Sequence, residues 1–248
     1  MTIPTPTARS AGHDDRLATP EPGARVKVCG IKDPGEVDLL ARRQVDFVGL
    51  WQGVPGGPAE LPPEQWRALA ARAAATEGLT PVLVTFLSDA EKIRAALEGS
   101  PVNWVQLHGY PTPGVVKAVK AISPDVRVIK VLHIRGGKCV EERLFGAYEK
   151  AGTDVFLFDV VTDDGRVGST GQTIDAGLVA SLAEGLTRPF LLAGGISAEN
   201  RADFAAVTGH PLFLGIDVDT NARGADGGID DGRVAAIVAA WKDGGRDA

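Results

Sequence analysis

The stretch RVKVCGIKDPGEV, residues 25–37, holds one complete strand-to-helix unit. Residues 26–30 (VKVCG) form a short, mainly apolar run that ends in glycine, as a buried strand does. Residues 34–44 (PGEVDLLARRQ) begin with proline and carry apolar residues at helical spacing, which favours a helix. The unit therefore places a cysteine, Cys29, where the predicted strand ends.

The same pattern recurs along the chain. Seven further apolar runs follow, at 46–51, 81–86, 102–108, 126–132, 154–160, 189–195 and 211–218. Each is apolar on both faces, which is typical of parallel strands covered by helices. Helical patterns follow the remaining strands at 62–75, 89–99, 112–123, 139–152, 175–185, 197–209 and 230–242. Eight such units in a chain of this length predict an α/β fold, a single-domain (βα)8 TIM barrel, rather than an open doubly wound sheet.

Composition limits the domain organisation and the partners. Residues 1–24 are rich in Pro, Thr, Ala and charge and lack the apolar core of a secretory signal, so a flexible leader is expected there. The barrel domain is expected over 25–243 and a frayed tail over 244–248. The net charge of −6, without any run of five basic residues, argues against a nucleic-acid partner.

Two cysteines in 248 residues do not make a disulfide framework and suit a reducing compartment, so a cytoplasmic protein is expected. No stretch approaches 18 consecutive apolar residues, and no membrane span is expected. The expected partner is a small-molecule substrate, and the expected assembly is a monomer or a homodimer.

The predicted barrel directs the search for a site, because catalytic groups of this fold lie at the carboxyl ends of the strands. The polar or reactive residues at those ends are Cys29, Gln106, His108, Lys130, His133, Asp159, Gly194, Gly195, Asp217 and Asp219. Cys29 and Asp159 can form a base and acid pair, with a thiolate that removes a proton from carbon and a carboxylic acid that delivers one. Such a thiol needs a lowered pKa, from a helix N-terminus or a nearby cation. Alternatively, Cys29 only fills space in the core.

Two loops carry weaker signals. In LLAGGIS, residues 191–197, two glycines close a strand and Ser197 is predicted to cap a helix, an arrangement that can hold an anion. Gly-Gly is also an ordinary tight turn. GSTGQT, residues 168–173, is either a loop that closes over a ligand or a plain surface loop.

Taken together, the motifs resemble a known family. KVCGIKDPGEV at 27–37, VQLHG at 105–109, FLFD at 156–159, GSTGQTIDAGLV at 168–179, LLAGGISAENRADF at 191–204 and GIDV at 215–218 stand in the order and spacing of phosphoribosylanthranilate isomerase. That family comprises TIM-barrel isomerases of tryptophan biosynthesis. The resemblance extends over nearly all of residues 25–243.

The resemblance implies an Amadori-type rearrangement of an aldose into a ketose, without a metal or an organic cofactor. By similarity, Cys29 would be the general base that removes the C2′ proton, and Asp159 the general acid that opens the furanose ring. Substrate-binding positions are expected at Gln106, His108, Gly194, Gly195, Asp217, Asp219, Thr220 and Arg223, with phosphate on the two glycine N–H groups.

Two departures from the family pattern concern the ends of its substrate. Where the family has an SPR segment, whose arginine binds the anthranilate carboxylate, this chain has GPA and so Ala59. After GIDV, Asp219 replaces the first serine of the family's phosphate loop, and a carboxylate repels a phosphate unless a cation intervenes. Thr220 can still donate a hydrogen bond, and Arg223 can offset Asp219.

Three readings therefore stand. The chain is an isomerase of this family with a substitute cation, from Arg223, Arg166 or Lys130. Alternatively, it is a divergent member of a specialised pathway that performs acid–base isomerisation or lyase chemistry on a different, unphosphorylated small molecule. The third reading is a barrel that binds a ligand without turnover, for which a paired thiol and carboxyl would have no use.

Overall fold

The computed structural model describes residues 23–161 and 173–243. Almost all of the predicted leader, the predicted tail, Arg166 and the GSTGQT loop before Thr173 lie outside the described residues. Within the described ranges, no helix has the length and apolarity that a membrane crossing requires.

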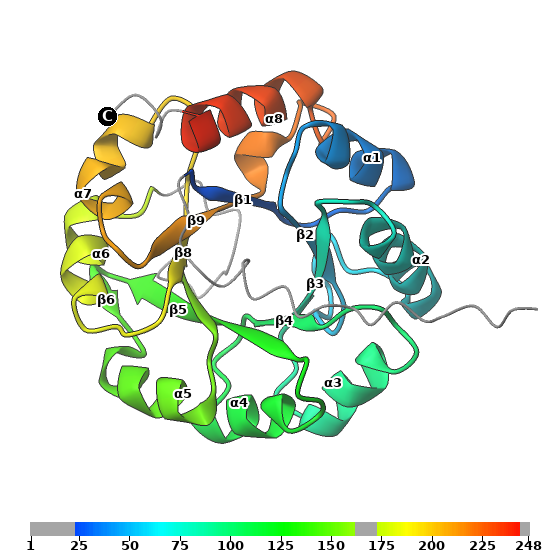
Figure 1. Cartoon of the computed structure of the whole chain (residues 1–248), viewed down its shortest axis with the longest axis horizontal. Coiled ribbons are helices and arrows are strands. Elements are labelled where there is room, and N and C mark those ends of the chain that lie inside the picture. Colours follow the sequence, from blue (N-terminus) through cyan, green and yellow to red (C-terminus); the bar gives the residue numbers. More distant parts are fainter. Residues whose placement is uncertain (1–22, 162–172, 244–248) are drawn as a thin grey trace, which may run out of the picture.

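Eight parallel strands close into a barrel ringed by helices (Figure 1). The strands are β1 (Arg25–Val28), β2 (Phe47–Trp51), β3 (Thr80–Thr85), β4 (Trp104–Leu107), β5 (Arg127–Arg135), β7 (Val155–Val160), β8 (Phe190–Leu192) and β9 (Phe213–Val218). They neighbour one another in chain order, and β9 returns to pair with β1. The predicted (βα)8 barrel and the place of each of its strands are confirmed.

The seam between β1 and β9 depends on one glycine. A Cβ atom on Gly215 would lie 2.0 Å from the carbonyl oxygen of Arg25, so only glycine lets the two strands approach. The pairing sets Lys27 opposite Asp217 and Val28 opposite Val218. The first and last strands of the barrel therefore meet in one fixed register.

Helices cover the barrel on all sides (Figure 1). They are α1 (Pro34–Arg42), α2 (Pro63–Ala74), α3 (Ala90–Leu97), α4 (Pro113–Lys120), α5 (Phe145–Ala151), α6 (Ala176–Ala183), α7 (Ala205–Thr208) and α8 (Asp231–Val238), together with a short 3-10 helix, η4 (Thr220–Ala222), and a π-helical turn, η5 (Ala239–Asp243). Several begin at an aspartate whose side chain accepts a hydrogen bond from the first turn, namely Asp33, Asp89, Asp175 and Asp230.

The helix predicted to begin at Ser197 starts later. The Ser197 N–H donates to the Asn200 side chain at 2.9 Å, and the Asn200 amide donates to the Gly195 carbonyl at 2.9 Å. These bonds close a turn over residues 197–200 and give the backbone an alternative to a helix. The prediction of Ser197 as an N-cap is therefore wrong: the 3-10 helix η3 (Arg201–Phe204) begins four residues further on and leads into α7.

A hairpin replaces the start of the helix predicted over 139–152. Gly136 and Gly137, with φ of 55° and 70°, form a two-residue turn that folds β6 (Lys138–Cys139) back on β5. The chain becomes helical only at η2 (Glu142–Leu144) and α5. The hairpin places Cys139 in the core and sets the residues after it against the end of β5.

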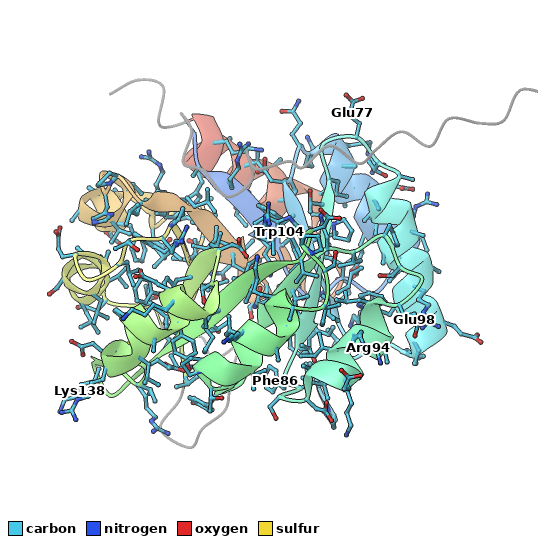
Figure 2. The ribbon with its side chains drawn as sticks, turned by 60° about the horizontal axis from the view of Figure 1, so that its bottom comes forward. Glu77, Phe86, Arg94, Glu98, Trp104 and Lys138 are labelled. Carbon is cyan, nitrogen blue, oxygen red and sulfur yellow. The ribbon has the colours of Figure 1, made fainter. Side chains whose placement is uncertain are left out.

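The core has two layers. One fills the barrel, where Trp104 meets Phe47 edge to face at 5.3 Å. The other lies between barrel and helices and includes Trp66 and Trp241. Figure 2 shows Trp104 in the middle of the molecule, with charged side chains such as Glu77 at its periphery.

Candidate active site

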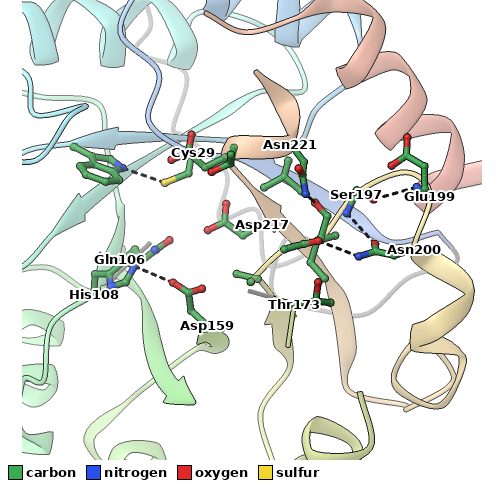
Figure 3. A pocket seen from close by; sticks show the side chains of 18 residues that line it. Cys29, Gln106, His108, Asp159, Thr173, Ser197, Glu199, Asn200, Asp217 and Asn221 are labelled. Atoms are coloured by element: carbon green, nitrogen blue, oxygen red, sulfur yellow. Dashed lines mark hydrogen bonds and ion pairs between the residues drawn. The ribbon is translucent and has the colours of Figure 1, made fainter. Parts of the chain in front are cut away.

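A cavity of about 380 Å³ opens at the carboxyl ends of the strands (Figure 3). Its lining comprises Cys29, Trp51, Gln106, His108, Asp159, Thr173, Ala193, Gly194, Gly195, Ile196, Ser197, Glu199, Asn200, Asp217, Val218, Asp219, Thr220 and Asn221. The volume suits a small ligand. All but one of the expected catalytic and binding residues line this cavity, and the exception is Arg223.

Cys29 directly follows β1 and is held by the barrel backbone. Its N–H donates to the Val218 carbonyl at 2.8 Å, and the indole Nε1 of Trp51 donates to its Sγ at 3.2 Å. A Cβ atom on Gly49 of β2 would lie 2.7 Å from this sulfur. The glycine of the neighbouring strand thus makes the space that the thiol occupies.

A buried ion pair lies below the thiol. The Nζ of Lys27 donates to both carboxylate oxygens of Asp217 at 2.9 Å, and Lys27 is fully buried. Burial alone would lower the pKa of Lys27, but Asp217 and, to a smaller extent, Cys29 together outweigh burial and raise it, so the lysine keeps its charge. Sequence reasoning missed Lys27, although it shares a strand face with Cys29 two residues later.

Burial governs the thiol itself. It raises the pKa of Cys29 to about 12, with further raising by the carboxylates of Asp217 and Asp219. The charge of Lys27 and the bond from Trp51 oppose this but do not overcome it. A catalytic thiol needs a lowered pKa, and Lys27 acts in that direction, but burial outweighs it and the net shift of the Cys29 pKa is upward.

Asp159 reaches the cavity from the end of β7 and faces a histidine. Its Oδ2 lies 3.4 Å from His108 Nε2, and its Oδ1 accepts from the Val160 N–H at 2.9 Å. Gln106, two residues before His108 on β4, is buried in the same wall. In the view of Figure 3, Asp217 lies between Cys29 and Asp159.

Gly194 and Gly195 form the opposite end of the cavity. Both have left-handed backbone, with φ of 85° and 70°, and a Cβ on Gly194 would lie 2.9 Å from Val160 Cγ2. In the part of the chain that the structure describes, neither glycine N–H has a protein acceptor. Consecutive N–H groups in such a turn can bind an anion, but the carboxylates of Glu199 and Asp219 line the same cavity.

Arg223 meets Asp219 but does not line the cavity. Its Nε donates to Asp219 Oδ1 at 2.6 Å, and its Nη2 donates to the carbonyls of Cys29 at 3.1 Å and Gly30 at 2.7 Å. The guanidinium thus joins the loop after β9 to the loop after β1. Its role in binding substrate stays a prediction.

Neither Ala59, at the position of the family arginine, nor Lys130, a candidate substitute for it, brings a charge to the cavity lining. Ala59 is buried in the apolar cluster that contains Cys29 and Trp51. Lys130 is fully buried outside the cavity lining, with its Nζ near the Glu141 carboxylate. Among residues 23–161 and 173–243, no three or more His, Cys, Asp or Glu side chains are grouped so that they could hold a metal ion.

Comparison with known proteins gives consistent matches over most of the chain. The family model described as N-(5'phosphoribosyl)anthranilate (PRA) isomerase matches residues 26–239. N-(5'-phosphoribosyl)anthranilate isomerase of Natronomonas pharaonis is 32% identical over 216 residues, which cover 86% of this chain and 96% of that protein. The second such isomerase of Methanosarcina mazei is 28% identical over 215 residues, 86% and 92% of the two chains. The solved structure of phosphoribosyl anthranilate isomerase from Thermus thermophilus superposes with a TM-score of 0.70 at 23% identity, covering 87% of this chain and 97% of that one.

Proposed function

Because the chain belongs to the N-(5'-phosphoribosyl)anthranilate isomerase family, a family of isomerases, we propose that it catalyses the Amadori-type rearrangement of N-(5'-phosphoribosyl)anthranilate, an aldose-to-ketose isomerisation. One observation carries the proposal: the thiol of Cys29 and the carboxyl of Asp159 line the same cavity from the ends of β1 and β7. Paired groups of this kind suit one proton removal and one proton delivery.

In the proposed mechanism, Asp159 delivers its proton to the furanose ring oxygen while the nitrogen lone pair expels that oxygen from C1′. The ring opens to a protonated imine. Cys29, as its thiolate, then takes the proton from C2′. The electron pair of that C–H bond forms the C1′=C2′ double bond while the π pair of the C=N bond returns to nitrogen, which gives the enaminol, the enol form of the amino ketose. The positive charge of the imine opposes the effect of burial on the thiol, whose pKa is about 12 without a ligand.

The phosphate is proposed to bind at the Gly194 and Gly195 N–H groups, with Thr220 and Asn221 beside them. The carboxylate of Asp219 would repel it, but the Arg223 guanidinium, 2.6 Å away, offsets much of that charge. Substrate would therefore be held mainly by hydrogen bonds from backbone and neutral side chains at this end.

A second candidate function has its own support. Among the described residues of the lining, four are carboxylates, Asp159, Asp217, Asp219 and Glu199, and none is a lysine or an arginine. With Ala59 in place of the family arginine, this charge balance favours a neutral or cationic substrate, such as an unphosphorylated amino sugar. The same acid and base would then serve a different molecule.

The test is turnover of freshly prepared phosphoribosylanthranilate, followed by the loss of its anthranilate-type fluorescence. The proposal expects turnover that Cys29→Ala and Asp159→Asn each abolish. Cys139→Ala, at the other buried cysteine, is the matched control and should keep the parent rate. Turnover that survives Cys29→Ala would overturn the proposed base.

No turnover by the parent protein would overturn the proposed substrate. A panel of unphosphorylated amino sugars then tests the second candidate with the same two variants. Conversion that depends on Cys29 would support it, whereas tight binding without conversion would favour a binding protein.

A further inference from the structure

The guanidinium of Arg223 connects the backbone beside the thiol to the loop after the last strand. Its Nη2 donates to the carbonyls of Cys29 at 3.1 Å and Gly30 at 2.7 Å. Its Nε donates to Asp219 Oδ1 at 2.6 Å, and its Nη1 donates to the Gly227 carbonyl at 3.0 Å. Only 15% of the Arg223 side chain is exposed. These four contacts are called the Arg223 bridge below.

The bridge leaves the guanidinium little capacity for a ligand. Of the five N–H groups of an arginine side chain, the one on Nε and the two on Nη2 each have a protein acceptor, and Nη1 has one. Nη1 also lies 3.9 Å from Glu36 Oε1. A bidentate bond to a phosphate or carboxylate needs two free N–H groups, and Arg223 does not line the cavity. The contacts therefore favour a role in holding the backbone.

The bridge also gives the carboxylate at position 219 a task. The Oδ1 of Asp219 accepts from the Arg223 Nε, and a Cβ atom on Gly30 would lie 3.5 Å from that oxygen. This oxygen is thus engaged beside the turn that follows β1. Two residues later, the side-chain amide of Asn221 donates to the Ile196 carbonyl at 2.8 Å and ties the same loop to the glycine turn. The loop after β9 therefore has separate attachments to the thiol and to the glycine turn.

The turn at Cys29 and Gly30 is held from two sides. Its N–H groups bind the barrel, with Cys29 donating to the Val218 carbonyl at 2.8 Å and Gly30 to the Gly49 carbonyl at 3.0 Å. Its carbonyls bind Arg223. Gly30 has a φ of 73°, and a Cβ atom there would lie 2.7 Å from the Arg223 Nη2, so glycine permits this approach. Loss of the guanidinium would release the carbonyl side of the turn.

We propose that Arg223 and Asp219 are positioning residues for Cys29: the guanidinium holds the turn that carries the thiol, and the carboxylate holds the guanidinium. Both act on the reaction through the place of the base and not through a contact with substrate. The assignment of Cys29 as the base rests on the proposed function. The local rigidity that the bridge gives to the two loops does not.

The first experiment measures amide hydrogen exchange of the full chain by mass spectrometry, without substrate. In Arg223→Ala, peptides over residues 29–33 and 219–224 should exchange at least about tenfold faster, as loss of a hydrogen bond from a charged group allows. Peptides over β5, across the barrel, should keep the parent rate. Arg43→Ala is the matched control, because it breaks an exposed ion pair with Asp231 between the same two units of the barrel and should leave residues 29–33 unchanged.

Two outcomes of this measurement would refute the proposal. The first is parent-like exchange over residues 29–33 in Arg223→Ala, which would mean that the bridge does not hold the turn. The second is faster exchange in all peptides, including those over β5, which would mean a general loss of stability instead of local positioning.

Small cations test whether the planar fork of the guanidinium matters. Methylguanidinium at millimolar concentration should slow the exchange of Arg223→Ala over residues 29–33 by more than half of the increase, because Asp219 and the carbonyls remain as acceptors. Methylammonium has the same charge without the fork and should not. Arg223→Lys should resemble Arg223→Ala for the same reason. Equal effects of the two cations would rule out a role for the fork.

Activity on whichever substrate the protein turns over gives an independent readout. A displacement of a reacting group by about 1 Å can cost about 100-fold in rate, so kcat of Arg223→Ala should fall by about that factor. KM should stay within about threefold, because the contact of Asn221 with Ile196 still holds the binding loop. Methylguanidinium should restore part of kcat, and Arg43→Ala should match the parent. A parent-like kcat despite faster exchange would contradict the positioning role.

Asp219→Ser separates the two roles open to Asp219. If the carboxylate holds Arg223, kcat should fall by about tenfold, the equivalent of one hydrogen bond between charged groups. Adding Asp219→Ser to Arg223→Ala should then lower kcat little further, since both act through one contact. If the carboxylate mainly repels substrate, Asp219→Ser would raise kcat/KM, and the proposal would be wrong.

The remaining outcomes are also decisive. If Arg223→Ala does not fold, Asp219→Ser carries both measurements, and parent-like exchange together with a parent-like kcat would refute the proposal. Absence of turnover in the parent protein would count against the proposed function, and the exchange data would then decide on the bridge by themselves.

Discussion

Replacing Lys27 by methionine tests the ion pair under the cavity. The change keeps the length of the side chain in the barrel interior but removes the charge that lies 2.9 Å from both oxygens of Asp217. The carboxylate would then be buried without a counter-charge, in a place where both side chains are almost fully shielded from water. We expect a large loss of stability that depends on pH.

The magnitude follows from the geometry. At an effective dielectric constant of about 20, unit charges at this distance attract by about 6 kcal/mol. The loss is smaller than this attraction, because the variant also avoids the cost of burying the ammonium group. The free energy of unfolding should therefore fall by about 3–5 kcal/mol.

The loss should depend on pH through Asp217. Burial already raises the pKa of Asp217 and Lys27 opposes that effect, so loss of the lysine raises the pKa further. A carboxyl whose folded pKa exceeds its unfolded value favours folding below that unfolded value, and this stability is lost as pH rises through the folded pKa. The destabilisation should therefore be larger at pH 8 than at pH 5.

Urea unfolding followed by tryptophan fluorescence, at both pH values, measures the effect. Lys27→Met combined with Asp217→Leu should regain much of the loss, because an apolar pair can replace a buried ion pair. Arg72→Met, which breaks the exposed ion pair with Asp38, is the matched control and should leave the midpoint near that of the parent. A loss below about 1 kcal/mol at pH 8, or an equal loss at both pH values, would refute the reasoning.

Three further substitutions test the placement of the thiol and the closure of the barrel. Gly49→Ala puts a methyl group 2.7 Å from the Cys29 sulfur and should lower kcat/KM at least tenfold; a parent-like value in steady-state kinetics would contradict this placement. Trp51→Phe removes the donor 3.2 Å from the sulfur and should raise the thiol pKa further. Alkylation of Cys29 by iodoacetamide at pH 9, measured by peptide mapping, should then slow about tenfold, because the free energy of one hydrogen bond to a charged group corresponds to about a tenfold change in the thiolate population. An equal or faster rate would count against the hydrogen bond from Trp51 to the sulfur. Gly215→Ala places a Cβ 2.0 Å from a carbonyl oxygen of β1 and should prevent the barrel from closing, so that thermal unfolding of any soluble protein no longer gives the parent transition.

The barrel was predictable because its pattern is redundant. Each parallel strand is buried on both faces and therefore appears in the sequence as an apolar run. Because the pattern occurs eight times, a wrong assignment of one strand would not change the predicted fold. The two local errors arose where side chains or turns competed with a helix. Asn200 closes a turn after Gly195 through its own amide, which the helical spacing of 197–209 conceals. The hairpin at Gly136 and Gly137 did have a sequence signal, since two adjacent glycines after an apolar strand are typical of a two-residue turn.

The candidate site was predictable only in part. The topology of a barrel gathers every strand end at one rim, so Cys29 and Asp159 were expected together and do line one cavity. The sequence does not show how burial and neighbouring charges balance in setting the pKa of a buried group. A cation beside Cys29 was expected to lower the thiol pKa, but how deeply the sulfur is buried depends on packing around it.

The charge pair of Lys27 and Asp217 also bears on how the chain is made. Its two members are separated by 190 residues and come from the first and last strands of the barrel. While a ribosome is still making the later strands, the lysine has no counter-charge and a barrel lacking β9 would have to bury it alone. Premature closure around Cys29 is thus penalised until Asp217 has emerged. The ion pair therefore disfavours burial of Lys27 before the final strand is present, because only β9 supplies its counter-charge.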